Sequence, residues 1–325
     1  MEAHEPASYM TTALPFDLAM AHVHALGGAT PAEQPIPGVA GDSCLYKHLP
    51  PDVYHADRDA LSCSLMKPLL VSPAHFQAGL VTCEKPSDAL DFGTLVHLLV
   101  LQPELASKEL AVFPGIAERK TAAGRTAFDV FEQANTGKLV VDEPTFAEGR
   151  RVAQRVRDTR YKGRPLQLFI EESIPEATIY FTEPSTGLRM RIRMDAYHPD
   201  VSFDLKTTRF AQARAFMRDA IDKDYDLQSY MYSLGRCLYE GVTTPKPFVF
   251  VAAENTAPYS VSTYEAGATF MGNGANKFQA CAAAFKACTE SGYWPDLSGD
   301  SVLEIEPWQQ FSAKAGWQAA LASGA

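Results

Sequence analysis

The amino-acid sequence predicts an α/β fold in which helices flank a central mixed β-sheet. Strand-like patterns cluster between residues 176 and 208, and helical patterns lie on both sides of this cluster. A further apolar strand follows at residues 247–254. The order helix, three strands, helix, strand is typical of a sheet with helices packed against it.

The first half of the chain is predicted to be helical. Residues 61–76 predict a short helix that Pro73 ends, and residues 87–104 predict a longer apolar helix that Pro103 stops, because proline cannot continue a helix. Charged and apolar positions mix over residues 115–160, which predicts one or two amphipathic helices.

A β region follows. Residues 176–183 and 188–197 are joined by a PSTG turn and predict a hairpin, and residues 201–208 predict a third strand. The second hairpin strand has the strand period of two, with Met190, Ile192 and Met194 alternating with Arg189, Arg191 and Arg193.

The last third of the chain returns to helices. Residues 213–241 predict one helix that ends at Gly241, residues 247–254 predict the last strand, and residues 276–292 predict a closing helix. Residues 1–44 are rich in Ala, Pro and Gly and predict a loosely structured extension. We therefore expect one domain over residues 45–325.

Composition limits the classes of function. The 325 residues are 46% hydrophobic, enough for a sizeable core, and the net charge of −10 excludes a generally basic nucleic-acid wrapper. The N-terminus, MEAHEPASYM, lacks the basic start of a signal peptide, and no apolar run reaches the ~18–20 residues of a membrane span. The six cysteines form no CxxC pair, which disfavours an iron–sulfur centre. We expect a cytoplasmic protein with no membrane partner.

The stretch MDAYHPDVSFDLKTT carries the chemistry. If its strands pair, Asp195 and Asp204 converge at one end of the sheet, where two carboxylates repel unless a cation lies between them. Hard oxygen ligands suit Mg²⁺ or Mn²⁺. Lys206 faces the same side of the strand as Asp204, and its ammonium can orient a water or stabilise charge on a phosphate. This is a constellation for phosphodiester hydrolysis.

An acid and a lysine two residues apart on a strand are also commonly a solvated ion pair. The neighbours here, Val201, Phe203 and Leu205, are apolar. They indicate a semi-buried position, where unpaired charge is costly, and this favours a functional role.

The motif resembles that of PD-(D/E)xK nucleases, and MDAY followed by DLKTT resembles the RecE-type exonucleases (the exodeoxyribonuclease VIII nuclease domain). Three further segments resemble that family: YHADRDALSCSLMKPLLVSPAHF, FGTLVHLLVLQPE with its GTxxHxxxLxPE pattern, and QSYMY with its QxxxY pattern. The resemblance as a whole spans roughly Tyr46 to the tail, which is most of the chain. The resemblance implies a restriction-endonuclease-like core.

The resemblance also implies site residues. The implied metal ligands are His97, Asp195, Asp204 and the backbone carbonyl of Leu205. The implied catalytic residues are Asp195, Asp204, Lys206, Gln228 and Tyr232. From the residues alone, a histidine in the setting of His97 is more often a core histidine, and Gln228 with Tyr232 equally fits an ordinary pair on one helix face. Glu176, which follows Glu171 and Glu172, is a further candidate acid.

The implied function is a Mg²⁺-dependent exonuclease, with Mn²⁺ as a substitute. It digests double-stranded DNA ends from 5′ to 3′ and leaves 3′ single strands for recombination. A single-strand annealing protein is the implied partner, and a ring-shaped homo-oligomer is the implied assembly. Arginines near the motif are candidate DNA contacts: Arg189, Arg191, Arg193, Arg209, Arg214 and Arg218. The alternatives are an endonuclease or single-strand-specific nuclease of the same superfamily, or a non-catalytic DNA-binding protein on the same fold.

Overall fold

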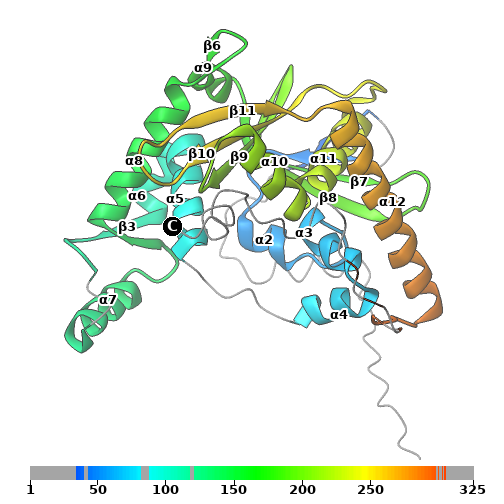
Figure 1. Cartoon of the computed structure of the whole chain (residues 1–325), viewed down its shortest axis with the longest axis horizontal. Helices are drawn as coiled ribbons and strands as arrows, with labels where there is room; N and C mark the ends of the chain where they lie inside the picture. Colours follow the sequence, from blue (N-terminus) through cyan, green and yellow to red (C-terminus); the bar gives the residue numbers. More distant parts are fainter. Residues whose placement is uncertain are drawn as a thin grey trace, which may run out of the picture.

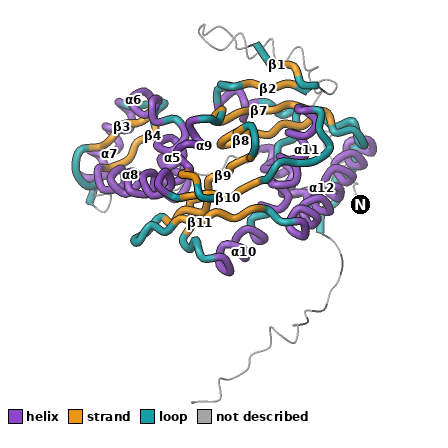
Figure 2. Tube along the Cα trace, turned by 90° about the horizontal axis from the view of Figure 1, so that it is seen from above, coloured by secondary structure: helices purple, strands orange, loops and turns teal. Residues whose placement is uncertain are grey.

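A computed structural model of the chain describes residues 34–39, 43–81, 88–117, 121–297, 299, 302 and 304. In these residues one central sheet lies between two groups of helices (Figure 1, Figure 2). A membrane-spanning helix is absent from this part of the chain.

The central sheet is mixed, as predicted. In order across the sheet, the described strands are β1 (Ile36–Pro37), β2 (Cys44–Tyr46), β7 (Ile174–Thr182), β8 (Arg189–His198), β9 (Val201–Thr208), β10 (Phe248–Glu254) and β11 (Val261–Glu265). Strands β9 and β10 run parallel, and the other neighbouring pairs are antiparallel. The predicted hairpin is β7 and β8, and the predicted third strand is β9.

Each face of the sheet has its own apolar core. On one face Phe203 and Leu205 of β9 pack with α5 (Asp88–Leu101), α8 (Glu143–Asp158) and α9 (Leu166–Glu171). On the other face Ile192 of β8 packs with α3 (Cys63–Met66), α4 (Pro73–Val81), α10 (Ala213–Asp222), α11 (Tyr225–Glu240) and α12 (Ala268–Ser291). Figure 2 shows α5 and α8 on one side of the strands and α11 and α12 on the other.

Smaller elements surround these layers. They are α2 (Pro51–Ala56), α6 (Ala106–Glu109), α7 (Ala122–Ala134), the 3₁₀ turns Lys67–Leu70 and Pro103–Leu105, and two small sheets, β3 (Leu110–Phe113) with β4 (Leu139–Asp142) and β5 (Arg160–Tyr161) with β6 (Arg164–Pro165).

Two of the predicted helices are each divided into separate elements in the structure. Residues 61–76 form α3, a 3₁₀ turn and the start of α4, and Pro73 begins α4 instead of ending a helix. Proline fits the first turn of a helix, where its missing N–H is not needed. Residues 213–241 form two helices, because Asp224 adopts a left-handed conformation (φ 53°) between α10 and α11.

The C-terminal boundaries also differ from prediction. Strand β10 is not the last, since β11 pairs with it. Helix α12 begins at Ala268, well before the predicted start, and it contains Gly274. A Cβ at Gly274 would lie 2.0 Å from the carbonyl oxygen of Asp226, so the glycine lets α12 pack closely against α11.

The predicted extension, residues 1–44, lies mostly outside the described residues. Within it, β1 and Cys44 of β2 pair at the edge of the central sheet. The division into residues 1–44 and 45–325 stays a prediction.

Candidate active site

The candidate site lies where β8 and β9 separate. Their ladder pairs Ala196 with Phe203 and ends there. Beyond it, the N–H of Leu205 donates to Asp195 Oδ2 at 2.7 Å, so a carboxylate takes the place of a strand carbonyl. Met194 and Ala196 lie in the cores on opposite faces, although residues two apart in a regular strand share a face. Strand β8 is therefore irregular at Asp195.

Glu176 lies opposite this irregularity. The ladder pairs on either side are Pro175 with Ala196 and Ala177 with Met194, so Glu176 is level with Asp195 but is not part of the ladder. Its φ of 52° lies in the left-handed region, which residues other than glycine rarely adopt. Such strain is concentrated at functional sites, where the surrounding structure imposes it.

Helix α5 brings His97 to Asp195. His97 Nε2 lies 3.1 Å from Asp195 Oδ2, and Nδ1 lies 2.8 Å from the carbonyl oxygen of Gly93. A Cβ at Gly93 would lie 3.3 Å from Thr207 Oγ1 of β9, so glycine allows the helix to approach the sheet closely. The hydrogen bond to Gly93 fixes the ring and directs Nε2 at the carboxylate.

Asp204 and Lys206 lie on the α11 side of the sheet. Lys206 Nζ is 2.7 Å from Asp204 Oδ2, and Gln228 Nε2 of α11 donates to Asp204 Oδ1 at 2.7 Å. The Lys206 ammonium also lies 4.7 Å from the centre of the Tyr225 ring. Asp204 is almost fully buried, with 2% of its side chain exposed. The lysine is thus held between a carboxylate and an aromatic face.

The carboxylates of this site are crowded. Burial, reinforced by the negative charge of Asp195, raises the pKa of Glu176 to about 7. Burial also raises the pKa of Asp204 to about 6, with Lys206 opposing and Asp195 adding to the shift. Negative charge concentrated in a poorly hydrated place favours a bound cation.

The pKa values of the two cationic side chains are also raised, but by neighbouring negative charge and against the effect of burial. Burial alone would lower the pKa of His97, but the Asp195 carboxylate raises it to about 9. Burial alone would also lower the pKa of Lys206, but Asp204 and Asp195 raise it. The pKa of Asp195 is held below its ordinary value, because His97 and Lys206 outweigh the effect of burial.

The donor set fits a hard divalent cation. As the side chains stand, no three His, Cys, Asp or Glu residues in the described part of the chain converge as a metal cluster. Instead His97 and Lys206 are ion-paired with Asp195 and Asp204. Asp204 Oδ2 is buried and accepts no hydrogen bond of good geometry, so it has a lone pair to offer. With Nδ1 donating to the Gly93 carbonyl, loss of the proton on Nε2 would leave a lone pair directed at the same place, as a metal ligand requires.

The other predicted site residues are Tyr232, Leu205 and Glu172, and their side chains do not join this cluster of charged groups. Tyr232, one turn beyond Gln228, is nearly buried and packs edge-on to Phe248, and its hydroxyl forms no hydrogen bond to a described residue. Leu205 contributes its N–H to Asp195, while the metal-ligand role of its carbonyl stays a prediction. Glu172 pairs with Arg164 and His198, outside this cluster.

Two of the candidate DNA-contacting arginines are interior. Arg191 is 2% exposed, donates to the carbonyl of Ala60 and lies 3.6 Å from Asp57. Arg193 has 11% of its side chain exposed and lies 3.8 Å from Glu176. These two arginines brace β8 and are not available to DNA, which corrects the expectation.

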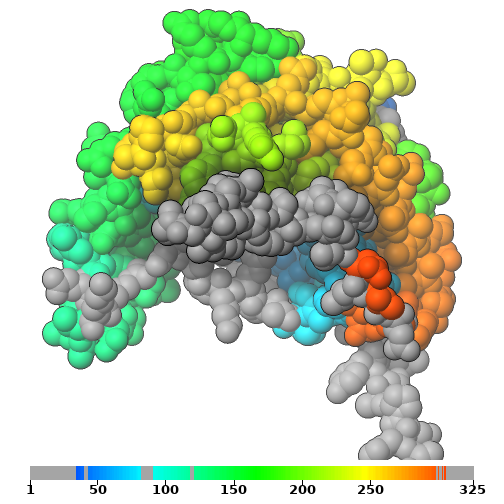
Figure 3. Space-filling model, in the orientation of Figure 1, coloured from blue at the N-terminus to red at the C-terminus, as the bar shows by residue number. Residues whose placement is uncertain are grey.

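The second arginine group is exposed. Arg209 lies just after β9, and Arg214 and Arg218 lie on α10; all three side chains are exposed. Figure 3 shows α10 as a yellow-green ridge on the surface of the molecule. These side chains remain available to a phosphate backbone.

Sequence reasoning missed Tyr225. It lies three residues before Gln228, so both side chains share one face of α11. The available signal was this spacing, but it is only useful once α11 is known to begin at Tyr225.

Comparison with known proteins agrees with this geometry. The sequence pattern of the family described as "PDDEXK-like domain of unknown function" (DUF3799) matches residues 62–306. The chain belongs to this PDDEXK-like family. No curated protein matches the sequence.

Among solved structures, one match is to a chain with a similar fold. It comes from a protein of Eubacterium rectale named as a candidate exonuclease, with 14% sequence identity and a TM-score of 0.50. The match covers 75% of this chain and 87% of that one. The restriction-endonuclease-like core is therefore confirmed, and membership of the PDDEXK-like family supports a nuclease. Nucleases of the PD-(D/E)xK type generally use divalent metal ions.

Proposed function

We propose that this PDDEXK-like chain is a divalent-metal-dependent deoxyribonuclease. The observation that carries the proposal is the meeting of Asp195, Asp204 and Lys206 at the point where β8 and β9 separate, with His97 and Glu176 beside them. A binding module has no need for a buried acid beside a half-buried acid and a half-buried lysine, whose desolvation is costly. A hydrolase needs all three.

In this proposal Asp195, Asp204 and His97 Nε2 hold a Mg²⁺ or Mn²⁺ ion, with Glu176 and the Leu205 carbonyl as additional oxygen donors. When bound, the ion supplies Lewis-acid polarisation of the phosphate and a more acidic bound water. Gln228 holds Oδ1 of Asp204 and leaves Oδ2 directed at the site.

Lys206 acts as a donor in this scheme. Its raised pKa keeps the side chain charged at neutral pH, so it gives hydrogen bonds and does not remove a proton from water. The ammonium orients the attacking water and stabilises charge that develops on the phosphate. Asp204 and the Tyr225 ring restrict its position, which reduces the ordering needed in the transition state.

The finer proposal concerns the substrate. The resemblance to RecE-type exonucleases supports digestion of double-stranded DNA ends from 5′ to 3′, leaving 3′ single strands. The exposed Arg209, Arg214 and Arg218 are suitable phosphate contacts beside the site. A single-strand annealing protein as partner and a ring-shaped homo-oligomer belong to the same proposal, as does a role in recombination.

The test uses a linear duplex labelled at the 5′ or the 3′ end, incubated with Mg²⁺ or with EDTA. Wild type is compared with Lys206→Ala and with Lys138→Ala, which removes an exposed lysine elsewhere. We expect metal-dependent loss of the 5′ label first, in wild type and Lys138→Ala only. Cleavage of a closed circle would identify an endonuclease instead. Duplex binding without cleavage under any metal condition would favour the non-catalytic alternative.

A further inference from the structure

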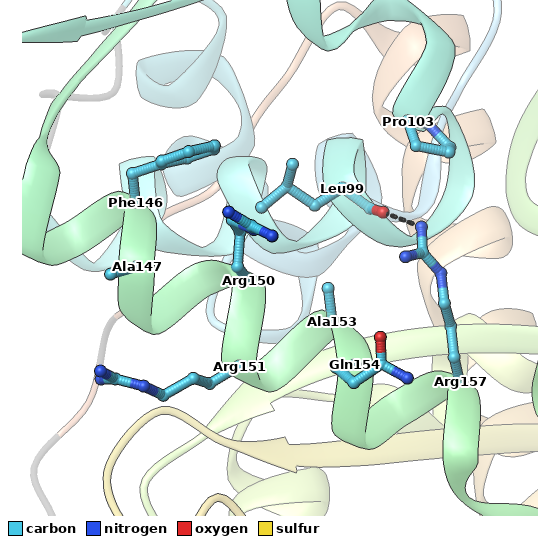
Figure 4. A pocket seen from close by; sticks show the side chains of 9 residues that line it. All are labelled: Leu99, Pro103, Phe146, Ala147, Arg150, Arg151, Ala153, Gln154 and Arg157. Carbon is cyan, nitrogen blue, oxygen red and sulfur yellow. Dashed lines mark hydrogen bonds between the residues drawn. The ribbon is translucent and has the colours of Figure 1, made fainter.

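A basic groove lies between α8 and the C-terminal end of α5. Its cavity measures about 470 Å³, and its lining includes Leu99, Pro103, Phe146, Arg150, Arg151 and Arg157 (Figure 4). We call it the arginine groove. Figure 4 shows Arg150 and Arg157 directed toward Leu99, whereas Arg151 extends back along α8.

The charge of this groove is unbalanced. No carboxylate lines it, and neither Arg150 nor Arg151 forms an ion pair with any residue in the described ranges. Arg157 is held by a hydrogen bond to the carbonyl oxygen of Leu99. Arginines placed together without acids repel one another, and here they do so in a chain whose net charge is −10. The local charge is complementary to an anionic ligand.

The lining is apolar between the guanidinium groups. Leu99, Pro103 and the Phe146 ring form this part, and the Arg150 guanidinium lies 5.9 Å from the centre of that ring. An inorganic anion gains nothing from such a surface. A nucleotide does, because its phosphate meets arginine while its base stacks on an aromatic or apolar side chain.

The groove is separate from the candidate active site. Leu99 follows His97 by two residues, which places the two side chains about 200° apart around α5. A ligand in the groove therefore lies on the other side of α5 from Asp195. Contacts at such a distance act by retaining the substrate, since a second attachment raises its effective concentration at the first.

We propose that the arginine groove is an accessory binding site for single-stranded nucleic acid. Arg150, Arg151 and Arg157 contact successive phosphates, and Phe146 stacks with a base. This inference rests on the proposed nuclease function, for which the groove retains a strand at a second attachment point, across α5 from the site of cleavage. The guanidinium fork favours phosphate, which it can contact with two parallel hydrogen bonds.

The test measures fluorescence anisotropy of a labelled oligothymidylate in EDTA, where no cleavage occurs. We expect Arg150→Ala/Arg151→Ala to weaken binding and to reduce the slope of log affinity against log salt by about 1.4, about 0.7 for each lost phosphate contact. Phe146→Leu should weaken binding by about 5-fold or more, because it removes base stacking. Arg125→Ala/Lys138→Ala removes two exposed charges elsewhere and should leave both quantities unchanged.

Several results would overturn the inference. Equal affinity and equal salt slope for wild type and the double variant would do so, as would no binding of the oligonucleotide to wild type. If the double variant instead loses binding of a labelled glutamate- and tryptophan-containing peptide, and not of the oligonucleotide, the groove is a peptide-docking site. The melting temperature of each variant in the same buffer checks that the exposed substitutions leave folding intact.

The two proposals fail separately. Oligonucleotide binding that depends on Arg150 and Arg151, with no cleavage of any DNA in Mg²⁺, would leave the groove standing and remove the nuclease function. Cleavage that requires Lys206, with no effect of the groove variants on oligonucleotide binding, would leave the nuclease function and remove the groove.

Discussion

Helices α5 and α11 lie on opposite faces of the sheet, and each directs a polar side chain to the point where β8 and β9 separate. From α5, His97 meets Asp195 with a ring nitrogen that can bind a metal. From α11, Gln228 meets Asp204 with an amide, and Tyr225 lies against Lys206. The α5 side thus offers a ligand, whereas the α11 side orients groups that are already charged.

The two sides also differ in burial. Asp195 has 15% of its side chain exposed and His97 has 28%, whereas Asp204 has only 2%. Lys206, also on the α11 side, has 19% of its side chain exposed, so burial separates Asp204 from the other three groups. In this arrangement α5 supplies a side chain that can bind a metal, and α11 supplies side chains that position Asp204 and Lys206. The two helices are about 130 residues apart in the chain.

The largest expected effect tests whether the buried Asp204 carboxylate is essential for cleavage. Asp204→Asn preserves shape but removes the charge that faces Lys206 and the proposed metal. We expect cleavage of linear duplex DNA in Mg²⁺ to fall by about 10³-fold or more, since residues that act as a unit fail together. Activity within a few fold of wild type would show that Asp204 is not a site residue.

The next effect tests the ligand role of the α5 side. His97→Ala should raise the Mg²⁺ concentration needed for half-maximal cleavage by about 10- to 100-fold. Gln228→Ala should lower the maximal rate with little change in that concentration. The same Mg²⁺ dependence in both variants would contradict the division between the two helices.

A smaller effect tests the positioning role of Tyr225. Tyr225→Leu should lower the maximal rate by about 5-fold, because an ammonium–aromatic contact is worth about 1 kcal/mol. Tyr225→Phe keeps the ring and should retain nearly full activity. A loss in the phenylalanine variant as large as in the leucine variant would assign the effect to the hydroxyl.

The smallest effect concerns stability without metal. The pKa of His97 is raised to about 9 in the folded chain from its ordinary value of 6.5. The protonated ring paired with Asp195 therefore stabilises the fold fully below pH 6.5, and this contribution disappears as pH rises through 9. In EDTA, the difference in free energy of unfolding between wild type and His97→Gln should shrink from pH 6 to pH 10. Urea titrations at several pH values measure it, and a constant difference would refute the pairing.

The sequence predicted which elements carry the candidate site residues. The strand period over residues 188–197 and the DLKTT stretch located Asp195, Asp204 and Lys206, and the apolar helix over residues 87–104 located His97. The structure places these residues in the predicted strands and helix, because each placement depends on periodicity within one element, which local sequence specifies. Their roles in catalysis and metal binding stay predictions. Gln228 was also placed correctly, on a helix that faces the sheet.

Other features followed only from tertiary contacts. The predicted surface role of Arg191 failed because α2 and the carbonyl of Ala60 cover its face of β8, and strand alternation does not say what covers a face. The break at Asp224 was missed because no glycine or proline marks it. Lys277 of α12 pairs with Asp224 and Asp226 across the break, which a local pattern cannot reveal.

The sequence by itself determined the class of fold, the order of the main strands along the chain and the elements that carry the candidate acids and lysine, because hydrophobic periodicity and residue type are local properties. Tertiary structure decided that β8 and β9 separate at Asp195, that Glu176 is held opposite it with φ 52°, and that Tyr225 lies under Lys206. These features arise where segments distant in the chain pack together, and packing between such segments selects conformations that no single segment prefers.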